Sequence, residues 1–162
     1  MHGTGRTGVT SYATPTDREV VVTRVVNASR SLVFETFTDP RHIQQWMIGP
    51  EGWTMPVCEM DLRPGGAWRY VYRKADGSEM TLTGRCLEIA APERFVATES
   101  WGPEWPESIN TLVLTEHAGQ TTITMTLTYP SREARDAALK TGMKEGMDQG
   151  FARLDEMLKT LV

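Results

Sequence analysis

The sequence predicts an α+β fold in which a curved antiparallel β-sheet wraps around a long C-terminal helix. Alternating apolar segments between residues 55 and 129 are joined by turn signals at hairpin spacing, which requires an antiparallel sheet. An amphipathic segment from about 131 to 161 is long enough to cover the apolar face of such a sheet. Two short helical segments follow the first strand. The predicted order is therefore β-α-α-β-β-β-β-β-β-α.

The composition narrows the classes of partner. A length of 162 residues favours one domain, which we expect over 18–162 after a flexible tail over 1–17 that lacks the apolar core of a secretory signal. The net charge of −4, without a run of basic residues, argues against nucleic acid or a membrane surface. Cys58 and Cys86 offer neither a disulfide framework nor metal spacing, so a reducing, cytoplasmic setting is expected.

The first part of the domain predicts one strand and two helices. Residues 19–27 are β-branched and predict a strand. Asn27 or Ser29 can cap the helix that follows. Asp39 and Pro40 are typical of a cap and first position, and they predict a second, short helix.

Six further strands follow, and one of them carries an aromatic face. Their predicted ranges are 55–63, 67–74, 78–90, 93–101, 109–117 and 121–129. Trp68, Tyr70 and Tyr72 share one face of their strand because side chains alternate. Gly84, in the middle of a long strand, predicts a bulge or bend. The last strand places threonines on the outer face and Tyr129 inward.

The C-terminal helix is unusual for its glycines. Gly142, Gly146 and Gly150 recur every fourth residue, and each glycine inside a helix costs about 0.5–1 kcal/mol relative to alanine. Such a stripe can allow close packing on the sheet, or it can leave room for a ligand; the sequence leaves both open. The second half carries an apolar stripe that predicts ordinary core packing: Phe151, Leu154, Leu158 and Leu161.

Several stretches together resemble a known superfamily. They are ASRSLVFETFTDPRHIQQW, MDLRPGGAWRY, DGSEMTLTGRCLEIAAPERFVATESW and GMKEGMDQGFARLDEMLKTL, which cover nearly all of residues 19–161. The chain resembles a START-like (SRPBCC, birch-pollen-allergen-like) helix-grip domain, and within that group the bacterial relatives of the activator of the heat-shock-protein ATPase (AHSA-like). Met47 departs from the pattern, since relatives commonly carry an aromatic residue there. The resemblance implies a cavity between the sheet and the C-terminal helix.

The candidate ligand-binding residues combine aromatic rings, a few polar groups and the flexible first half of the last helix. They are Trp46, Trp68, Tyr70, Arg85, Glu99, Trp101, Asn110, Gly142, Met143 and Met147. Tyr72 and Trp53 are interpreted as core residues. The inward position of Arg85 depends on whether a bulge at Gly84 reverses the alternation.

Three functions stay open. The first is a binding module for a small apolar or aromatic molecule, without cofactor or metal. The second is a cyclase- or hydrolase-like enzyme of the same superfamily, although the sequence has no recognised catalytic motif; it would need titratable groups such as Glu99 with His42 or Arg85 in the cavity. The third is a chaperone-interacting protein, as the name of the family suggests. A protein partner or a homodimer also stays open.

Overall fold

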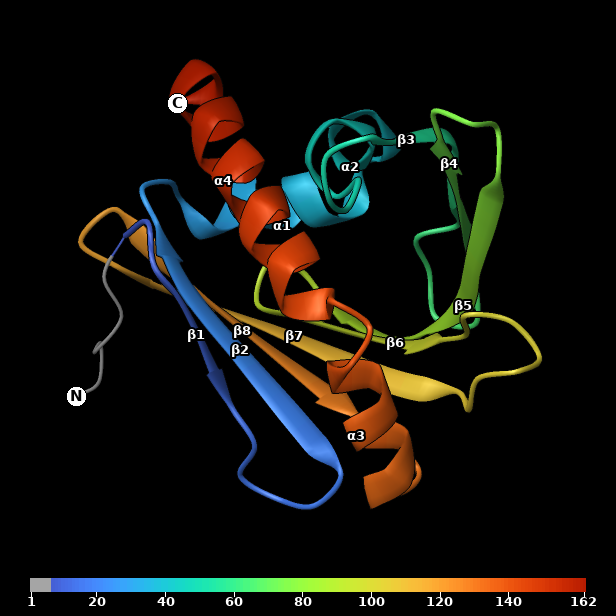
Figure 1. Cartoon of the computed structure of the whole chain (residues 1–162). Coiled ribbons are helices and arrows are strands. Elements are labelled where there is room, and N and C mark those ends of the chain that lie inside the picture. The colour runs from blue at the N-terminus through green and yellow to red at the C-terminus, as the bar shows by residue number, and fades with distance from the viewer. Residues whose placement is uncertain (1–6) are drawn as a thin grey trace.

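A computed structural model describes residues 7–162 of the chain. Within these residues, eight strands form one antiparallel sheet in the order β1-β2-β8-β7-β6-β5-β4-β3 (Figure 1). The strands are β1 (Thr10–Ala13), β2 (Glu19–Val26), β3 (Trp53–Met60), β4 (Ala67–Lys74), β5 (Glu79–Ala90), β6 (Arg94–Glu99), β7 (Ser108–His117) and β8 (Gln120–Thr128). The curved antiparallel sheet that the sequence predicts is confirmed.

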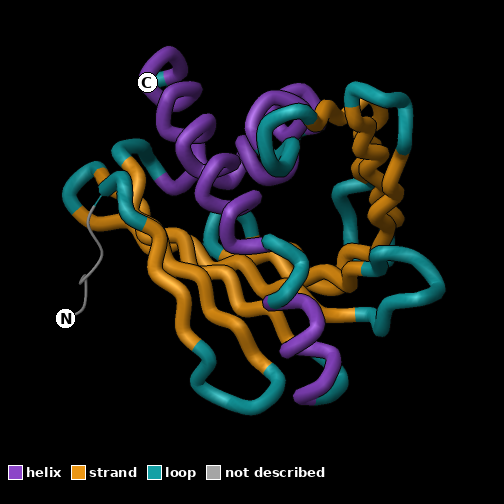
Figure 2. Tube along the Cα trace, viewed as in Figure 1, coloured by secondary structure: helices purple, strands orange, loops and turns teal. Residues whose placement is uncertain are grey.

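The helices lie on the concave side of the sheet. They are α1 (Arg30–Thr38), α2 (Pro40–Trp46), α3 (Arg132–Leu139) and α4 (Met143–Leu161). Figure 2 shows the strands curving around this side, so that β3, β4 and the first part of β5 stand apart from the broad sheet below α4. No helix among residues 7–162 is both long and apolar enough to span a bilayer.

The predicted flexible tail is wrong for part of its length. Residues 10–13 form β1 and pair with β2, for example Tyr12 with Val22. The Tyr12 hydroxyl also donates to the Asp148 carboxylate of α4, 2.7 Å away. A strand of four residues is held by these long-range contacts, which local sequence does not reveal. Residues 1–6 of the predicted tail lie outside the described residues.

The C-terminal helix is two helices, and this corrects the predicted single helix. Lys140 ends α3, and Gly142 precedes α4 with φ +80°, a left-handed conformation that favours glycine. Gly142 is therefore a helix boundary and carries no penalty of a glycine inside a helix. Only Gly146 and Gly150 lie within α4.

The second half of α4 packs into the main core, as predicted, except at its end. Phe151, Leu154 and Leu158 are fully buried against β2, β7, β8 and α1. Leu161 is 40% exposed, so the predicted stripe ends one turn earlier. Arg24 of β2, itself buried, forms an ion pair with Asp155 on the neighbouring face of the helix.

Gly84 lies where β5 changes partners. The residues of β5 up to Arg85 pair with β4, and those from Cys86 onward pair with β6. The register is regular at Gly84, which pairs with Trp68, and the irregularity falls between Cys86 and Glu88. A Cβ on Gly84 would lie 1.9 Å from the carbonyl oxygen of Thr98. Glycine is therefore required by a close approach of backbone at this bend, and the predicted bulge at Gly84 is wrong.

Candidate ligand-binding cavity

A cavity of about 550 Å³ lies between the concave face of the sheet and the first half of α4. The sheet supplies its floor through inward-facing side chains of β6, β7 and β8. These are Phe95, Ala97, Leu112, Met125 and Leu127. Alternation along each strand explains the set, since Phe95 pairs with Leu112 and Leu112 pairs with Met125.

The far wall of the cavity is aromatic. Three aromatic residues of β4 line the cavity together, as their alternation predicts: Trp68, Tyr70 and Tyr72. The ring centroids of Trp68 and Tyr70 lie 4.6 Å apart. Tyr72 belongs to a buried hydrophobic cluster against which Trp53 packs, as predicted, and both residues also line the cavity. Burial raises the pKa of the Tyr70 and Tyr72 hydroxyls well above the ordinary value, so both stay neutral donors.

The first half of α4 covers the cavity. Met143, Gly146, Met147 and Gly150 line it, together with Gly142 just before the helix. A Cβ on Gly150 would lie 3.2 Å from the carbonyl oxygen of Trp46, whereas a Cβ on Gly146 would make only an ordinary contact, 3.4 Å from Pro50. Close packing therefore explains Gly150, and Gly146 leaves its side of the helix uncrowded.

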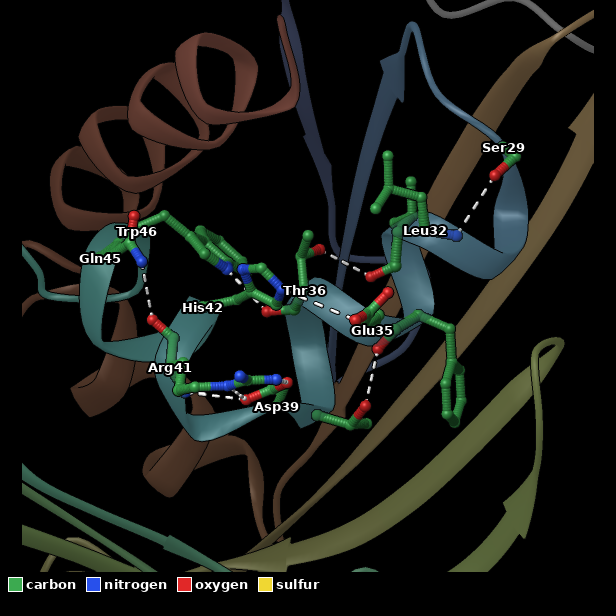
Figure 3. Close-up of polar contacts among 12 residues, drawn as sticks. Ser29, Leu32, Glu35, Thr36, Asp39, Arg41, His42, Gln45 and Trp46 are labelled. Atoms are coloured by element: carbon green, nitrogen blue, oxygen red, sulfur yellow. Dashed lines mark hydrogen bonds and ion pairs between the residues drawn. The ribbon is translucent and has the colours of Figure 1, made fainter. Parts of the chain in front are cut away.

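Trp46, at the end of α2, is held rigidly at the edge of the cavity. Figure 3 shows its indole N–H donating to the carbonyl oxygen of Thr36 on α1, a hydrogen bond of 2.8 Å. The indole also stacks on Phe151 at 5.8 Å and meets the edge of Phe37 at 4.9 Å. Asp39 caps α2, as predicted, through the backbone N–H of Arg41.

Polar groups gather at the β6–β7 end of the cavity. Glu99, the last residue of β6, accepts a hydrogen bond of 3.0 Å from the indole N–H of Trp101. Burial raises the pKa of Glu99, and the nearby side chains of Asn110 and Trp101 oppose the rise. Ser108 pairs with Glu99 across the strands and also lines the cavity.

All predicted site residues except Arg85 line the cavity, and they come from α2, β4, β6, β7, α4 and two loops. They are Trp46, Trp68, Tyr70, Glu99, Trp101, Asn110, Gly142, Met143 and Met147. Arg85 is exposed and donates to the backbone carbonyl of Gly65, so its predicted inward position is wrong. The reason is the regular register at Gly84, which leaves the alternation unreversed.

Sequence reasoning missed Ser108, although the alternation that selected Asn110 also selects the residue two positions earlier. It also missed the contribution of α3, whose Ala134 and Ala138 line the cavity. Small residues in a separate helix give no signal in the sequence. The catalytic pairing of Glu99 with His42 or Arg85 is not assembled, because neither partner lines the cavity.

A second cluster of titratable groups lies outside the cavity, where Glu35, Asp39 and His42 come together at the α1–α2 junction (Figure 3). Arg41 donates to both oxygens of the Asp39 carboxylate, at 3.2 and 2.8 Å. These hydrogen bonds lower the pKa of Asp39 to about 2. The Asp39 carboxylate is thus engaged by Arg41 and by the cap of α2.

The comparisons with known proteins identify the family. The model of the family "Activator of Hsp90 ATPase homolog 1-like protein" matches residues 27–159, so the chain belongs to this family. No curated protein matches the chain.

Solved structures share the fold over nearly the whole chain. A protein from Rhodobacter sphaeroides is 27% identical with a TM-score of 0.88, covering 95% of this chain and 100% of its own. A protein from Mycobacterium smegmatis is 25% identical with a TM-score of 0.82, covering 93% and 97%. An AHSA1 protein from Silicibacter pomeroyi, at 20% identity, TM-score 0.72 and coverage of 89% and 99%, shows the fold alone.

Proposed function

We propose that this member of the family binds a small apolar or aromatic molecule in the cavity between the sheet and α4. The observation that carries the proposal is the cavity itself. Protein interiors are close-packed, with few voids larger than a water molecule, whereas this one measures about 550 Å³. That volume lies within the range of about 300–1,000 Å³ that small-molecule sites occupy.

The chemistry of the lining supports the same class of ligand. Trp68, Tyr70 and Tyr72 offer flat apolar surfaces with a polar group at the edge, which suits aromatic ligands. Met143 and Met147 cover the cavity with unbranched, adaptable side chains, which suit ligands of irregular shape. Polar groups are few in the lining, and Glu99, Ser108 and Asn110 gather at the β6–β7 end, an arrangement suited to orienting a ligand.

The test is a titration with N-phenyl-1-naphthylamine, a neutral probe whose fluorescence rises in apolar surroundings. Ala97 lies on the floor of the cavity, so Ala97→Phe should occupy part of it. Thr111 lies on the opposite face of the neighbouring strand, and Thr111→Phe is the matched control. We expect the probe to bind the wild type and Thr111→Phe, and to bind Ala97→Phe at least about tenfold more weakly.

Two results would contradict the proposal. One is the absence of probe binding by the wild type. The other is equal affinity for Ala97→Phe and Thr111→Phe, with both variants folded by circular dichroism, because binding would then occur elsewhere.

The proposal includes a reducing, cytoplasmic setting, which is supported by Cys58 and Cys86 being free thiols.

The family match supports a second candidate, contact with a chaperone of the Hsp90 class. The surface considered for this contact is the outer face of β8, which is polar and uncharged. It carries the predicted threonines: Thr122, Thr124, Thr126 and Thr128. The ATPase rate of a purified Hsp90-class chaperone, measured with and without the chain, tests this candidate. An increase that Thr124→Arg abolishes would place the contact on this face, and an unchanged rate would remove the candidate.

A further inference from the structure

The lining of the cavity has a one-sided charge. Among the lining residues that the structure describes, Glu99 is the only one with a side chain that is fully charged at neutral pH in water. No lysine, arginine or histidine of the described chain lines the cavity with it. Arg85, the arginine predicted to face the cavity, is exposed and donates a hydrogen bond to the backbone carbonyl of Gly65. Glu99 is half-buried, and a carboxylate withdrawn from water normally has a cationic or hydrogen-bonding partner.

The protein satisfies this carboxylate only in part. Trp101 donates one hydrogen bond to it, of 3.0 Å. Two carboxylate oxygens can accept about four. The negative charge of Glu99 also adds to burial in raising the pKa of the Tyr72 and Tyr129 hydroxyls, and both residues line the cavity. Glu99 therefore has acceptor capacity left, in a cavity that supplies no cation.

The surroundings of Glu99 also favour a cation. Trp101, Trp105 and Tyr129 line the same end of the cavity. Faces of aromatic rings attract ammonium groups, most strongly where water is excluded. Trp101 and Trp105 are each 40% exposed, so the end that holds Glu99 is also bordered by side chains in contact with solvent. A charged head group could thus reach the carboxylate while an apolar body lies against Trp68 and Tyr70.

We infer that Glu99 selects ligands that carry a protonated amine on an aromatic or apolar body, and that it discriminates against carboxylates of the same shape. This inference rests on the proposed function. An ammonium donates charge-assisted hydrogen bonds to the free acceptor positions of the carboxylate. A ligand carboxylate would instead place a like charge beside Glu99 in a partly buried site, which is unfavourable.

Three ligands of nearly equal shape test the inference by isothermal titration calorimetry at pH 7: 1-naphthylmethylamine, 1-methylnaphthalene and 1-naphthoate. We expect the wild type to bind the amine at least about tenfold more tightly than the other two, the range for a hydrogen bond to a charged group. Glu99→Gln keeps the size of the side chain and removes its charge. It should lose that preference and bind 1-methylnaphthalene as the wild type does.

Glu107→Gln is the matched control, because Glu107 is an exposed glutamate in the loop between β6 and β7 and does not line the cavity. It makes the same change in net charge and should keep the preference for the amine. If 1-methylnaphthalene binds but the wild type shows no preference, or Glu99→Gln retains it, the inference is overturned while the cavity stands. If none of the three ligands binds, the proposed function fails with it.

Discussion

The two glycines inside α4 should respond in opposite directions to the same substitution. Replacing either by alanine removes the conformational cost of glycine in a helix, a gain of about 0.5–1 kcal/mol in the free energy of unfolding. At Gly146 nothing opposes this gain, because a Cβ would lie 3.4 Å from the Cδ atom of Pro50, an ordinary contact. Gly146→Ala should therefore stabilise the protein by about that amount.

At Gly150 the added methyl group would lie 3.2 Å from the carbonyl oxygen of Trp46, which is backbone and closer than side chains normally approach. Trp46 cannot retreat easily, since its indole is hydrogen-bonded to Thr36 and stacked on Phe151. Overpacking of this kind costs about 1–3 kcal/mol. The cost exceeds the helix gain, so Gly150→Ala should be destabilising or at best neutral.

Urea and thermal unfolding of the two variants beside the wild type measure the difference. We expect the variants to differ by about 1–3 kcal/mol, with Gly146→Ala the more stable. For a chain of this size, 1 kcal/mol corresponds to about 2–4 °C in Tm. Equal stabilisation by both substitutions would refute the reasoning, because it would show that α4 and α2 can separate freely at Trp46.

Three further predictions follow from buried or titratable groups. Asp155→Ala leaves the buried guanidinium of Arg24 without its carboxylate and should lower the free energy of unfolding in urea by on the order of 3 kcal/mol. Glu156→Ala, which removes one partner of an exposed ion pair, should change it by less than about 0.5 kcal/mol. Similar costs for the two variants would contradict the role given to burial. Because the pKa of Glu99 is raised in the folded protein, its stabilising contribution is complete below the ordinary carboxyl pKa and is lost as the pH rises through the folded value. Glu99→Gln should therefore gain stability relative to the wild type as the pH rises above the ordinary carboxyl pKa, and a difference independent of pH would count against it. Burial, with smaller effects from nearby acidic groups, raises the pKa of Cys58 to about 12, so iodoacetamide at pH 8 should modify this thiol in urea but hardly at all in the folded protein, as followed by mass spectrometry.

The architecture could be predicted from the sequence because its signals are local. Alternation and turn residues define strands β3 to β8, and the cap residues Ser29 and Asp39 define the starts of α1 and α2. β1 was not predicted, because its four residues are held by pairing with β2 and by a hydrogen bond from Tyr12 to α4. The break between α3 and α4 at Gly142 was not predicted, because glycines four residues apart fit a helical period and the sequence does not reveal which glycine has a positive φ.

The site was predictable to the extent that alternation could be followed along a strand. From Trp68 to Tyr72, and at Glu99 and Asn110, the inward faces follow from neighbouring apolar residues. The prediction for Arg85 is wrong because it needs a bulge at Gly84 that reverses the alternation, and the register there is regular. Of the two alternatives predicted at Gly84, a bulge or a bend, the bulge is wrong, and the glycine allows the backbone of Thr98 to approach closely.

The two halves of α4 explain how the fold can keep a cavity at all. A helix whose entire inner face carried Phe, Leu or Ile would close onto the sheet and fill the space. Here Phe151, Leu154 and Leu158 anchor the second half in the main core, and Trp46 fixes the point at Gly150 where the helix leaves that core. Beyond this point the inner face carries glycine and methionine, which cannot fill the volume. The close packing of α4 is thus concentrated in its second half, and its first half covers the cavity.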